Sequence, residues 1–369
     1  MSKNIEESYS SNNKILCYSF NQNGSCFCVG TEKGFTIYKS YPLIDYYIRE
    51  LEGGIGIIAM FNNSNIIGLV GGGRHPFASL NKLIIWNDAT SKVVCEITVD
   101  EKIRNVKVKD SLIAIITKKK IKIYYYDSLE NIINYKNIDT INTPNNPNGL
   151  FGLNLDPKLT IVSYLSNTVG EISVKDYGKI KNVDKIKSTT TTISAHQSEI
   201  TNMSLNNKGD LLASCSEKGT IIRLFSTETG NLLKELRRGN SLAEIYSINF
   251  DSNSKFLICS SSQGTVHIFN VKDSNTGIKN QKSFLSSIGS YLSIKNDYLK
   301  NEWSFAQYHI NYKGKNIVDF ISEDNDFAVL TENGIYHRAC FDSYKGGECT
   351  QIQKKDYFNL ETDDFDFDC

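Results

Sequence analysis

The feature that most constrains the fold of this chain is a short segment that recurs seven times. Each copy pairs a polar turn, often ending in glycine, with a run of alternating β-forming residues. Successive copies lie roughly 40–50 residues apart, apart from a last interval of about 70, and the shorter spacing is that of a four-stranded propeller blade. The copies begin at Thr31, Asn81, Thr117, Ser166, Ser216, Ser261 and Thr331.

The residues between the copies also repeat. ITNMSLNNKGDLLASCS precedes the fifth copy and IYSINFDSNSKFLICSS the sixth, and each reads as two strands joined by a polar turn. A β-sandwich is the alternative, but seven evenly spaced copies favour an all-β, seven-bladed β-propeller of the WD40 type. We expect the propeller to span residues 14–353, after a disordered N-terminus (1–13) and before an acidic tail (354–369).

Composition limits the partners of such a fold. Lysine plus arginine and aspartate plus glutamate both number 41, so the chain is not a general polyanion binder, and anion binding requires a local cluster. The nine cysteines are irregularly placed, and no signal peptide or apolar run of membrane-spanning length is present, which predicts a reduced, cytoplasmic protein. Neither the cysteines nor the five scattered histidines have metal-ligand spacing, so we expect no metal and no cofactor.

One local cluster resembles a known family signature. Leu-Arg-Arg-Gly, within GNLLKELRRGNSLAEIYSINF, is similar to the Phe-Arg-Arg-Gly of the PROPPIN family of WD-repeat proteins that interact with phosphoinositides, with Leu236 in place of phenylalanine. The fifth and sixth repeats around it also resemble the lipid-binding blades of that family, and the segments at Gly68 and Glu302 extend the similarity over most of the chain. The resemblance implies a propeller that binds phosphatidylinositol 3-phosphate or 3,5-bisphosphate, recruits protein partners, and acts in autophagy or endolysosomal traffic.

The chemistry of such a site is consistent with these residues. Neighbouring side chains on a strand point to opposite faces, so Arg237 and Arg238 serve two separate phosphate pockets, and Gly239 lets the backbone turn toward a ligand. Residues of the fifth blade complete the first pocket, and residues of the sixth complete the second, as the family's two lipid sites also imply. The first set is His196, Ser214, Ser216, Gly219, Thr220, Arg223 and Arg237; the second is Arg238, Gly239, Ser261, Thr265 and His267.

Two expectations about these pockets are testable. Protonated histidine donates from both ring nitrogens, so we expect binding to strengthen at mildly acidic pH. Replacing both arginines by alanine is expected to abolish membrane recruitment and leave the fold intact. The competing interpretations are structural: Arg-Arg-Gly as a solvated hairpin end, the Ser-x-x-Gly-Thr segments as ordinary blade turns, and His196 as a histidine that bonds across a blade.

The extra length in the sixth repeat lies in residues 271–302. Its apolar residues recur at helical spacing beside a serine-rich face and flanking lysines, a pattern typical of a segment that lies in a membrane interface. The apolar residues are Phe284, Leu285, Ile288, Tyr291 and Leu292. The family resemblance implies membrane insertion here; the alternative is a loop packed back on the propeller.

The main alternative function is a protein scaffold without lipid selectivity. In the family, basic residues near the third blade are linked to an autophagy partner, which would place that contact at Lys107 and Lys109. No catalytic constellation and no basic stripe with interleaved aromatics is present, so we expect neither an enzyme nor a nucleic-acid binder. The chain is therefore expected to be a monomer in solution that docks peripherally on preautophagosomal, endosomal or vacuolar membranes.

Overall fold

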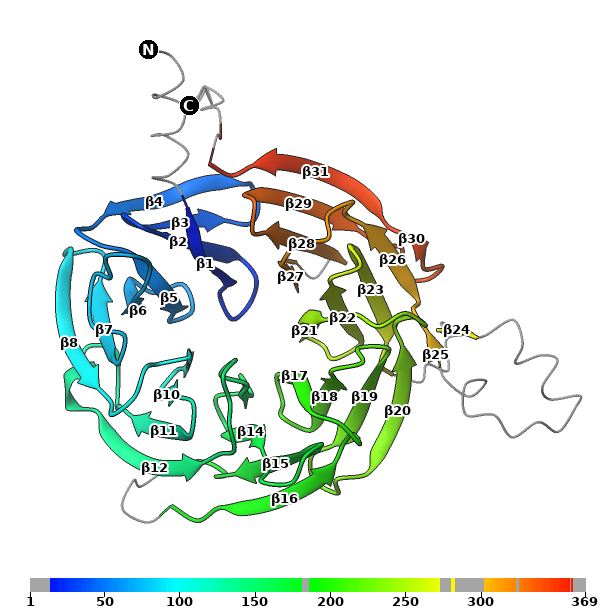
Figure 1. Ribbon diagram of the computed structural model, residues 1–369, viewed down its shortest axis with the longest axis horizontal. Helices are drawn as coiled ribbons and strands as arrows, with labels where there is room; N and C mark the ends of the chain where they lie inside the picture. Colours follow the sequence, from blue (N-terminus) through cyan, green and yellow to red (C-terminus); the bar gives the residue numbers. More distant parts are fainter. Residues whose placement is uncertain are drawn as a thin grey trace, which may run out of the picture.

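A computed structural model describes residues 14–180, 186–272, 280–282, 302–322, 325–358 and 360. Within those residues the strands form seven sheets arranged in a ring, which confirms the seven-bladed β-propeller (Figure 1). Consecutive strands of a blade pair in antiparallel fashion from the central axis outward, so β4, β8, β12, β16, β20 and β31 lie on the outer edge.

The blades are assembled as follows. Blade 1 holds β1 (Ile15–Phe20), β2 (Cys26–Thr31), β3 (Gly34–Lys39) and β4 (Ile44–Glu50); blade 2 holds β5 (Ile55–Met60), β6 (Ile66–Gly71), β7 (Lys82–Asn87) and β8 (Lys92–Thr98). Blade 3 holds β9 (Asn105–Lys109), β10 (Leu112–Ile116), β11 (Lys120–Tyr125) and β12 (Lys136–Asn142); blade 4 holds β13 (Gly152–Leu153), β14 (Ile161–Leu165), β15 (Glu171–Asp176) and β16 (Thr189–Ser194). Blade 5 holds β17 (Ile200–Leu205), β18 (Leu211–Ser216), β19 (Ile221–Ser226) and β20 (Leu232–Arg237), extended by β25 (Glu302–Trp303) and β24 (Gln281–Lys282). Blade 6 holds β21 (Ile245–Phe250), β22 (Phe256–Ser261), β23 (Thr265–Asn270), β26 (Ala306–His309) and β30 (Gly347–Glu348); blade 7 holds β27 (Asn316–Phe320), β28 (Asp326–Thr331), β29 (Ile335–Cys340) and β31 (Thr350–Asp356).

The recurrent segment of the sequence is the third strand of each blade with the turn before it. The seven copies become β3, β7, β11, β15, β19, β23 and β29. Their side chains alternate between the two faces of a blade, and both faces are covered by neighbouring blades, so apolar residues occur on both sides.

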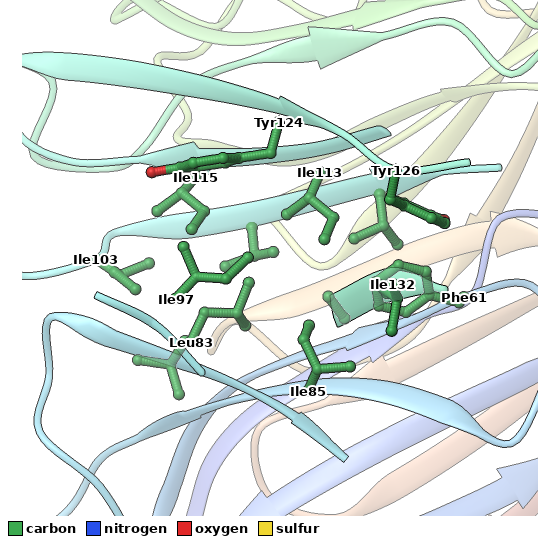
Figure 2. Close-up of a cluster of buried hydrophobic side chains, with 14 of the residues drawn as sticks. Phe61, Leu83, Ile85, Ile97, Ile103, Ile113, Ile115, Tyr124, Tyr126 and Ile132 are labelled. Atoms are coloured by element: carbon green, nitrogen blue, oxygen red, sulfur yellow. The ribbon is translucent and has the colours of Figure 1, made fainter. Parts of the chain in front are cut away.

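Most of the core lies between adjacent blades. Figure 2 shows one such layer, in which Leu83 and Ile85 of β7 face Ile113 and Ile115 of β10, while Tyr126 closes one end. These side chains are nearly or completely removed from solvent. Because each blade presents an apolar face to its neighbour, the ring is held by a series of sheet-on-sheet contacts.

The ring closes between the first and last blades through side chains. Phe27 stacks on Tyr38 of blade 1 and on Tyr336 of blade 7, with ring centroids 4.8 Å and 5.7 Å apart. Tyr336 donates a hydrogen bond from its hydroxyl to the carbonyl of Ser40. All described strands of blade 1 come from residues 15–50 and all those of blade 7 from residues 316–356, so packing joins the two ends of the chain.

One expected boundary differs in the structure. Strand β31 continues to Asp356 and Tyr357 is buried in the seam, so the propeller does not end at residue 353. The extra length does fall between the third and fourth strands of blade 6, β23 and β26. Phe284, Leu285, Ile288, Tyr291 and Leu292 lie outside the described residues, as do residues 1–13 and 361–369. In the described part, the sole helical segment is the three-residue Ile132–Asn134, and no helix is long enough to cross a bilayer.

Candidate functional site

The two adjacent arginines lie at the outer end of blade 5 and face opposite ways. Arg223 pairs with Glu235 across β19 and β20, so Arg237, two residues further along β20, shares the face of Arg223. Leu236 lies on the other face, in the core cluster between blades 5 and 6. Arg238, two residues after Leu236, is turned the same way, toward blade 6. One arginine therefore faces each neighbouring blade.

The first predicted pocket lies on the blade 4 side of blade 5. His196 Nε2 lies 3.0 Å from the hydroxyl of Ser214, which is fully buried and so holds the imidazole in place. Arg223 donates from Nη1 to the carbonyl of Ala195 at 2.8 Å, next to that histidine. These contacts bring His196, Ser214 and Arg223 together, with Arg237 on the same face.

Glu235 is a residue of this pocket that sequence reasoning missed. Its carboxylate accepts a hydrogen bond from Nε of Arg223 at 2.7 Å and lies 2.7 Å from Nη2 of the same side chain, which ties the guanidinium to β20. The signal was present in the sequence, because Glu235 lies two residues before Arg237 and alternation places both on one face. An ion pair within a charged pocket sets the orientation of the arginine before any ligand arrives.

Gly219 and Thr220 contribute backbone geometry. Gly219 has φ +58°, and a Cβ at this position would lie 1.8 Å from the carbonyl oxygen of Ala243. The carbonyl of Gly219 accepts a hydrogen bond from Nε of Arg238, and that of Thr220 accepts one from the Arg238 amide, both at 2.9 Å. The turn that was assigned to the first pocket thus also holds the arginine of the second. Ser216 ends β18 just before this turn, and its carbonyl accepts the Gly219 amide.

Arg238 is buried, with only 5% of its surface exposed. Besides its bond to Gly219, it donates from Nη2 to the carbonyl of Ser241, and burial lowers the pKa of its guanidinium. Its charge acts on Cys259 and His267 of blade 6, so the side chain reaches the predicted second pocket. An alanine here would leave carbonyl acceptors without donors, so the double arginine replacement is not expected to leave the fold undisturbed.

The sixth-blade residues of the second pocket come from the end of β22 and the start of β23. His267 Nδ1 lies 3.3 Å from the hydroxyl of Ser304, and the hydroxyl of Thr265 lies 3.1 Å from His309 Nδ1. Ser304 and His309 were not predicted, although both stand in the segment that follows the insertion. Gly239 follows Arg238 at the edge of this pocket, and a Cβ there would meet no atom within 4 Å. Ser261 is fully buried, and its hydroxyl accepts the amide of Gln263 at 3.4 Å in the blade turn.

Neither pocket histidine carries a charge at mildly acidic pH in the unliganded chain. Burial, followed by the nearby Arg223, lowers the pKa of His196 to about 4. Burial and the charge of Arg238 lower the pKa of His267 to about 3. The expectation that protonated histidines strengthen binding between pH 7.5 and 5.5 therefore does not apply to the free protein, because burial, and after it the nearby arginines, disfavours the protonated imidazole.

The insertion is attached at its base to the strand that carries the arginines. Strand β25 pairs in parallel with β20, which places Glu302 beside Leu236 and Trp303 beside Arg237. Asn280 donates to the Glu302 carboxylate at 2.5 Å, and Lys234 Nζ lies 3.5 Å from the same carboxylate. Both ends of the insertion thus meet at the outer edge of blade 5, next to the two pockets.

The two lysines expected to meet a protein partner, Lys107 and Lys109, have different surroundings in the structure. Lys109 is buried, and its ammonium donates to the side chain of Asn154 at 3.1 Å and to the carbonyl of Leu159. Burial lowers its pKa to about 8. Lys107 lines the central channel opposite Asp319. Lys107 and Lys109 are two residues apart on β9 and therefore share one face of the strand. Lys107 is exposed in the channel, whereas Lys109 is covered by blade 4 and is not accessible to a partner.

The chain is similar to known proteins along most of its length. The family model described as PROPPIN matches residues 14–358. SVP1-like protein 2 of Saccharomyces cerevisiae is 31% identical over 359 residues, which cover 89% of this chain and 80% of that protein. Autophagy-related protein 18e of Arabidopsis thaliana is 32% identical over 357 residues, covering 94% of this chain and 89% of that protein.

Solved structures agree with this fold. Kluyveromyces lactis Hsv2 with its complete loop 6CD superposes with a TM-score of 0.74 at 22% identity, covering 94% of this chain and 99% of that one. A complex of KlAtg21 with the coiled coil of AgAtg16 gives a TM-score of 0.72 at 22% identity, covering 93% of this chain and 99% of that one. At this identity the two structures establish the likeness of the propeller fold.

Proposed function

The chain belongs to the PROPPIN family, and from this premise we propose that it binds membrane phosphoinositides phosphorylated at the 3-position. The ligands are phosphatidylinositol 3-phosphate, the 3,5-bisphosphate, or both. The observation that carries the proposal is the placement of Arg237 and Arg238 on opposite faces of one strand end, each turned toward a separate set of histidine and hydroxyl groups. The function is recognition and recruitment, not catalysis.

The first pocket offers complementary donors for a phosphorylated inositol ring. Arg237 and Arg223 share one face of blade 5, and a planar guanidinium binds phosphate oxygens through two parallel hydrogen bonds. Glu235 holds the Arg223 guanidinium in place across the two strands. The neutral imidazole of His196 then donates to, or accepts from, a ring hydroxyl instead of competing for the phosphate charge.

The second pocket is more deeply set. Arg238 is anchored through Gly219 and Ser241, and its positive charge acts on His267 of β23. A guanidinium whose position is held by backbone carbonyls loses little conformational freedom when a phosphate binds. We therefore assign it a fixed electrostatic role, while the half-buried Arg237 is the more accessible clamp.

Membrane docking combines three weak contacts. The two pockets lie on the edge of the disc, and the base of the insertion is paired to β20, the strand that carries Arg237. If residues 284–292 enter the bilayer interface, the headgroup contacts and the insertion act together, and each raises the effective concentration of the others. In this arrangement the disc stands edge-on to the membrane and leaves its other surfaces for protein partners.

The cellular role that we assign is that of an effector or adaptor in autophagy or endolysosomal membrane traffic, with an autophagy-related protein as partner. The names of similar proteins support this assignment, including Autophagy-related protein 18e and the KlAtg21 complex. The protein would move between the cytoplasm and preautophagosomal, endosomal or vacuolar membranes.

The test is co-sedimentation with liposomes that contain each phosphoinositide in turn. We expect selective binding of 3-phosphorylated lipids and a loss of at least about tenfold in Arg237→Ala, because a charge-assisted contact is removed. Arg237→Lys should be intermediate, since it keeps the charge without the fork. Lys208→Ala, which removes one positive charge from the β17–β18 turn of the same blade, should bind like the parent.

The single replacement is preferred because Arg238 is buried and its loss would confuse binding with folding. Equal binding to every anionic lipid, or unchanged binding of a folded Arg237→Ala protein, would contradict the lipid-reader function. The protein would then be a WD-repeat scaffold without lipid selectivity.

A further inference from the structure

The innermost strands surround a central channel with an unusual charge distribution. The channel has a volume of about 870 Å³ and runs along the axis of the ring. Four cationic side chains line it, against two anionic ones. The cationic residues are Lys102, Arg104, Lys107 and Lys315, and the anionic ones are Glu244 and Asp319. For a chain with no net charge, this is a local excess of positive charge.

Three of the cations lie at the same mouth of the channel. Lys102 and Arg104 immediately precede β9, and Lys315 immediately precedes β27. The blades are repeats related by rotation about the axis, so the first residues of all innermost strands lie at one end. We call this end the cationic mouth. Lys107 lies deeper, within β9, and faces Asp319 near the end of β27.

The cationic side chains of this mouth, those of Lys102, Arg104 and Lys315, have no hydrogen-bonded or ion-paired partner among the described residues. Arg104 is the most telling of the three, because its Nε is buried and has no acceptor. Buried N–H groups in folded proteins nearly always have a partner, and an ionised group that lacks one is a place for an anion to bind.

The remaining lining leaves space for such an anion. Gly72, Gly73 and Asn148 also border the cationic mouth and contribute small or neutral surfaces. Glu244 is the single carboxylate among the mouth residues that line the channel. The volume is within the range of roughly 300–1,000 Å³ that small-molecule sites occupy.

We propose that the cationic mouth is a binding site for a compact, soluble, multiply phosphorylated anion. Arg104 of blade 3 and Lys315 of blade 7 would bind the anion, and Lys102 would supply a third positive charge. The site is separate from the rim pockets, because the three inter-strand steps from the innermost to the outermost strand of a blade span about 15 Å. A phosphoinositide in a bilayer would meet the rim, whereas a free inositol polyphosphate would reach the axis, so the ligand source is the solute.

The test is isothermal titration calorimetry with inositol hexakisphosphate at about 0.15 M salt, where surface charges are screened. We expect affinity to fall about tenfold in Lys315→Gln and in Arg104→Gln, as for the loss of one charge-assisted contact. Lys313→Gln is the matched control: it removes the same charge from an exposed lysine two residues away that does not line the channel. Arg237→Ala should retain the component that Lys315→Gln removes.

The outcomes distinguish a soluble anion bound in the channel from one bound in the rim pockets. An equal loss in Lys313→Gln and Lys315→Gln, or no binding by the parent, would overturn the proposal. A loss in Arg237→Ala without any in the channel variants would also overturn it and assign the solute to the rim. Lys315 is exposed, so folding of this variant is not in question, and its binding to phosphoinositide liposomes should equal that of the parent. That measurement separates failure of the channel site from failure of the lipid function.

Discussion

Arg237 and Arg238 are neighbours in the chain and yet have different physical roles. The first ends β20 and is half-buried, whereas the second is buried and bonded to two backbone carbonyls. A buried cation without polar partners is unstable, so Arg238 is available for phosphate binding only because Gly219 and Ser241 already stabilise it. Substitutions at the two positions should therefore be read differently, one as binding and the other as binding plus folding.

The buried histidines predict a pH dependence of stability. His337, far from the rim pockets, packs beside Tyr308, and burial lowers its pKa to about 4 from an ordinary value of 6.5. The folded state keeps it neutral while the unfolded state protonates it below pH 6.5, so stability is complete above pH 6.5 and declines toward pH 4. The contribution lost between pH 6.5 and 5 is about 2 kcal/mol.

Urea unfolding of the parent and of His337→Gln at pH 7 and pH 5 measures this contribution. The drop in unfolding free energy on acidification should be smaller in the variant by about 2 kcal/mol. Comparing the two proteins cancels the contributions of the other titrating groups to the pH dependence. Asp319 is one of them: burial raises its pKa to about 7, so it stabilises the folded state as the pH falls. An identical pH dependence in both proteins would show that His337 does not titrate in this range.

At the scale of elements, the edge of blade 5 brings together two segments that lie about 65 residues apart in the sequence: the strand with the arginines and the base of the insertion. β20 carries the arginines, and β25, from the far end of the insertion, pairs with it at Leu236 and Arg237. Glu302 further joins the insertion to Lys234 and Asn280. An outer strand that would otherwise expose its backbone groups is thus covered by the base of the insertion.

This arrangement leads to a prediction about the insertion. Serine in place of its apolar residues should weaken liposome binding by at least about tenfold, since several buried side chains are lost from the interface. The replaced residues are Phe284, Leu285, Ile288, Tyr291 and Leu292. Binding of a soluble inositol phosphate headgroup should be unchanged, because both pockets lie on the blades.

The matched control changes the opposite face of the same segment. Asparagine at Ser286, Ser287 and Ser290 alters as much of the sequence but leaves the apolar side chains in place. If both sets of substitutions weaken liposome binding equally, amphipathic insertion is not the mechanism, and the segment has another use.

At the scale of the whole molecule, the ring depends on the seam between blades 1 and 7. Phe27, Tyr38, Tyr336 and Tyr357 form an aromatic cluster in which residues from both ends of the chain touch. Side-chain packing and side-chain hydrogen bonds such as Tyr336–Ser40 join the described strands of these two blades, and no pairing between those strands does, so we expect the ring to open first at this seam. Loop closure over the whole chain is entropically costly, and this cluster offsets it.

Phe27→Ala should lower the unfolding free energy by about 3–5 kcal/mol, the usual cost of deleting a large buried ring. Ile48→Ala, on the exposed outer strand of the same blade, should change it by less than about 0.5 kcal/mol. Hydrogen exchange in Phe27→Ala should accelerate in β2 and β28 before it does in β10. Uniform acceleration throughout the ring would contradict a seam that opens first.

Much of the architecture was predictable because the repeat is encoded locally. The third strand of each blade, such as β19 after Gly219, is indicated in the sequence by a polar turn and by two-residue alternation of apolar side chains. The opposite orientation of Arg237 and Arg238 followed from the same alternation. Lys109 was misjudged, because alternation says which face a residue occupies but not whether a neighbouring blade covers it.

By itself, the sequence determined the number of blades, the place of the insertion and the strand that bears the arginines, because these depend on periodicity within a few residues. Only the tertiary structure decided what surrounds each group: that Arg238 is buried and bonded to carbonyls, that the pocket histidines are uncharged, and that Arg104 and Lys315 both line one channel. Burial and electrostatic fields arise from blades far apart in the chain, so no local pattern encodes them.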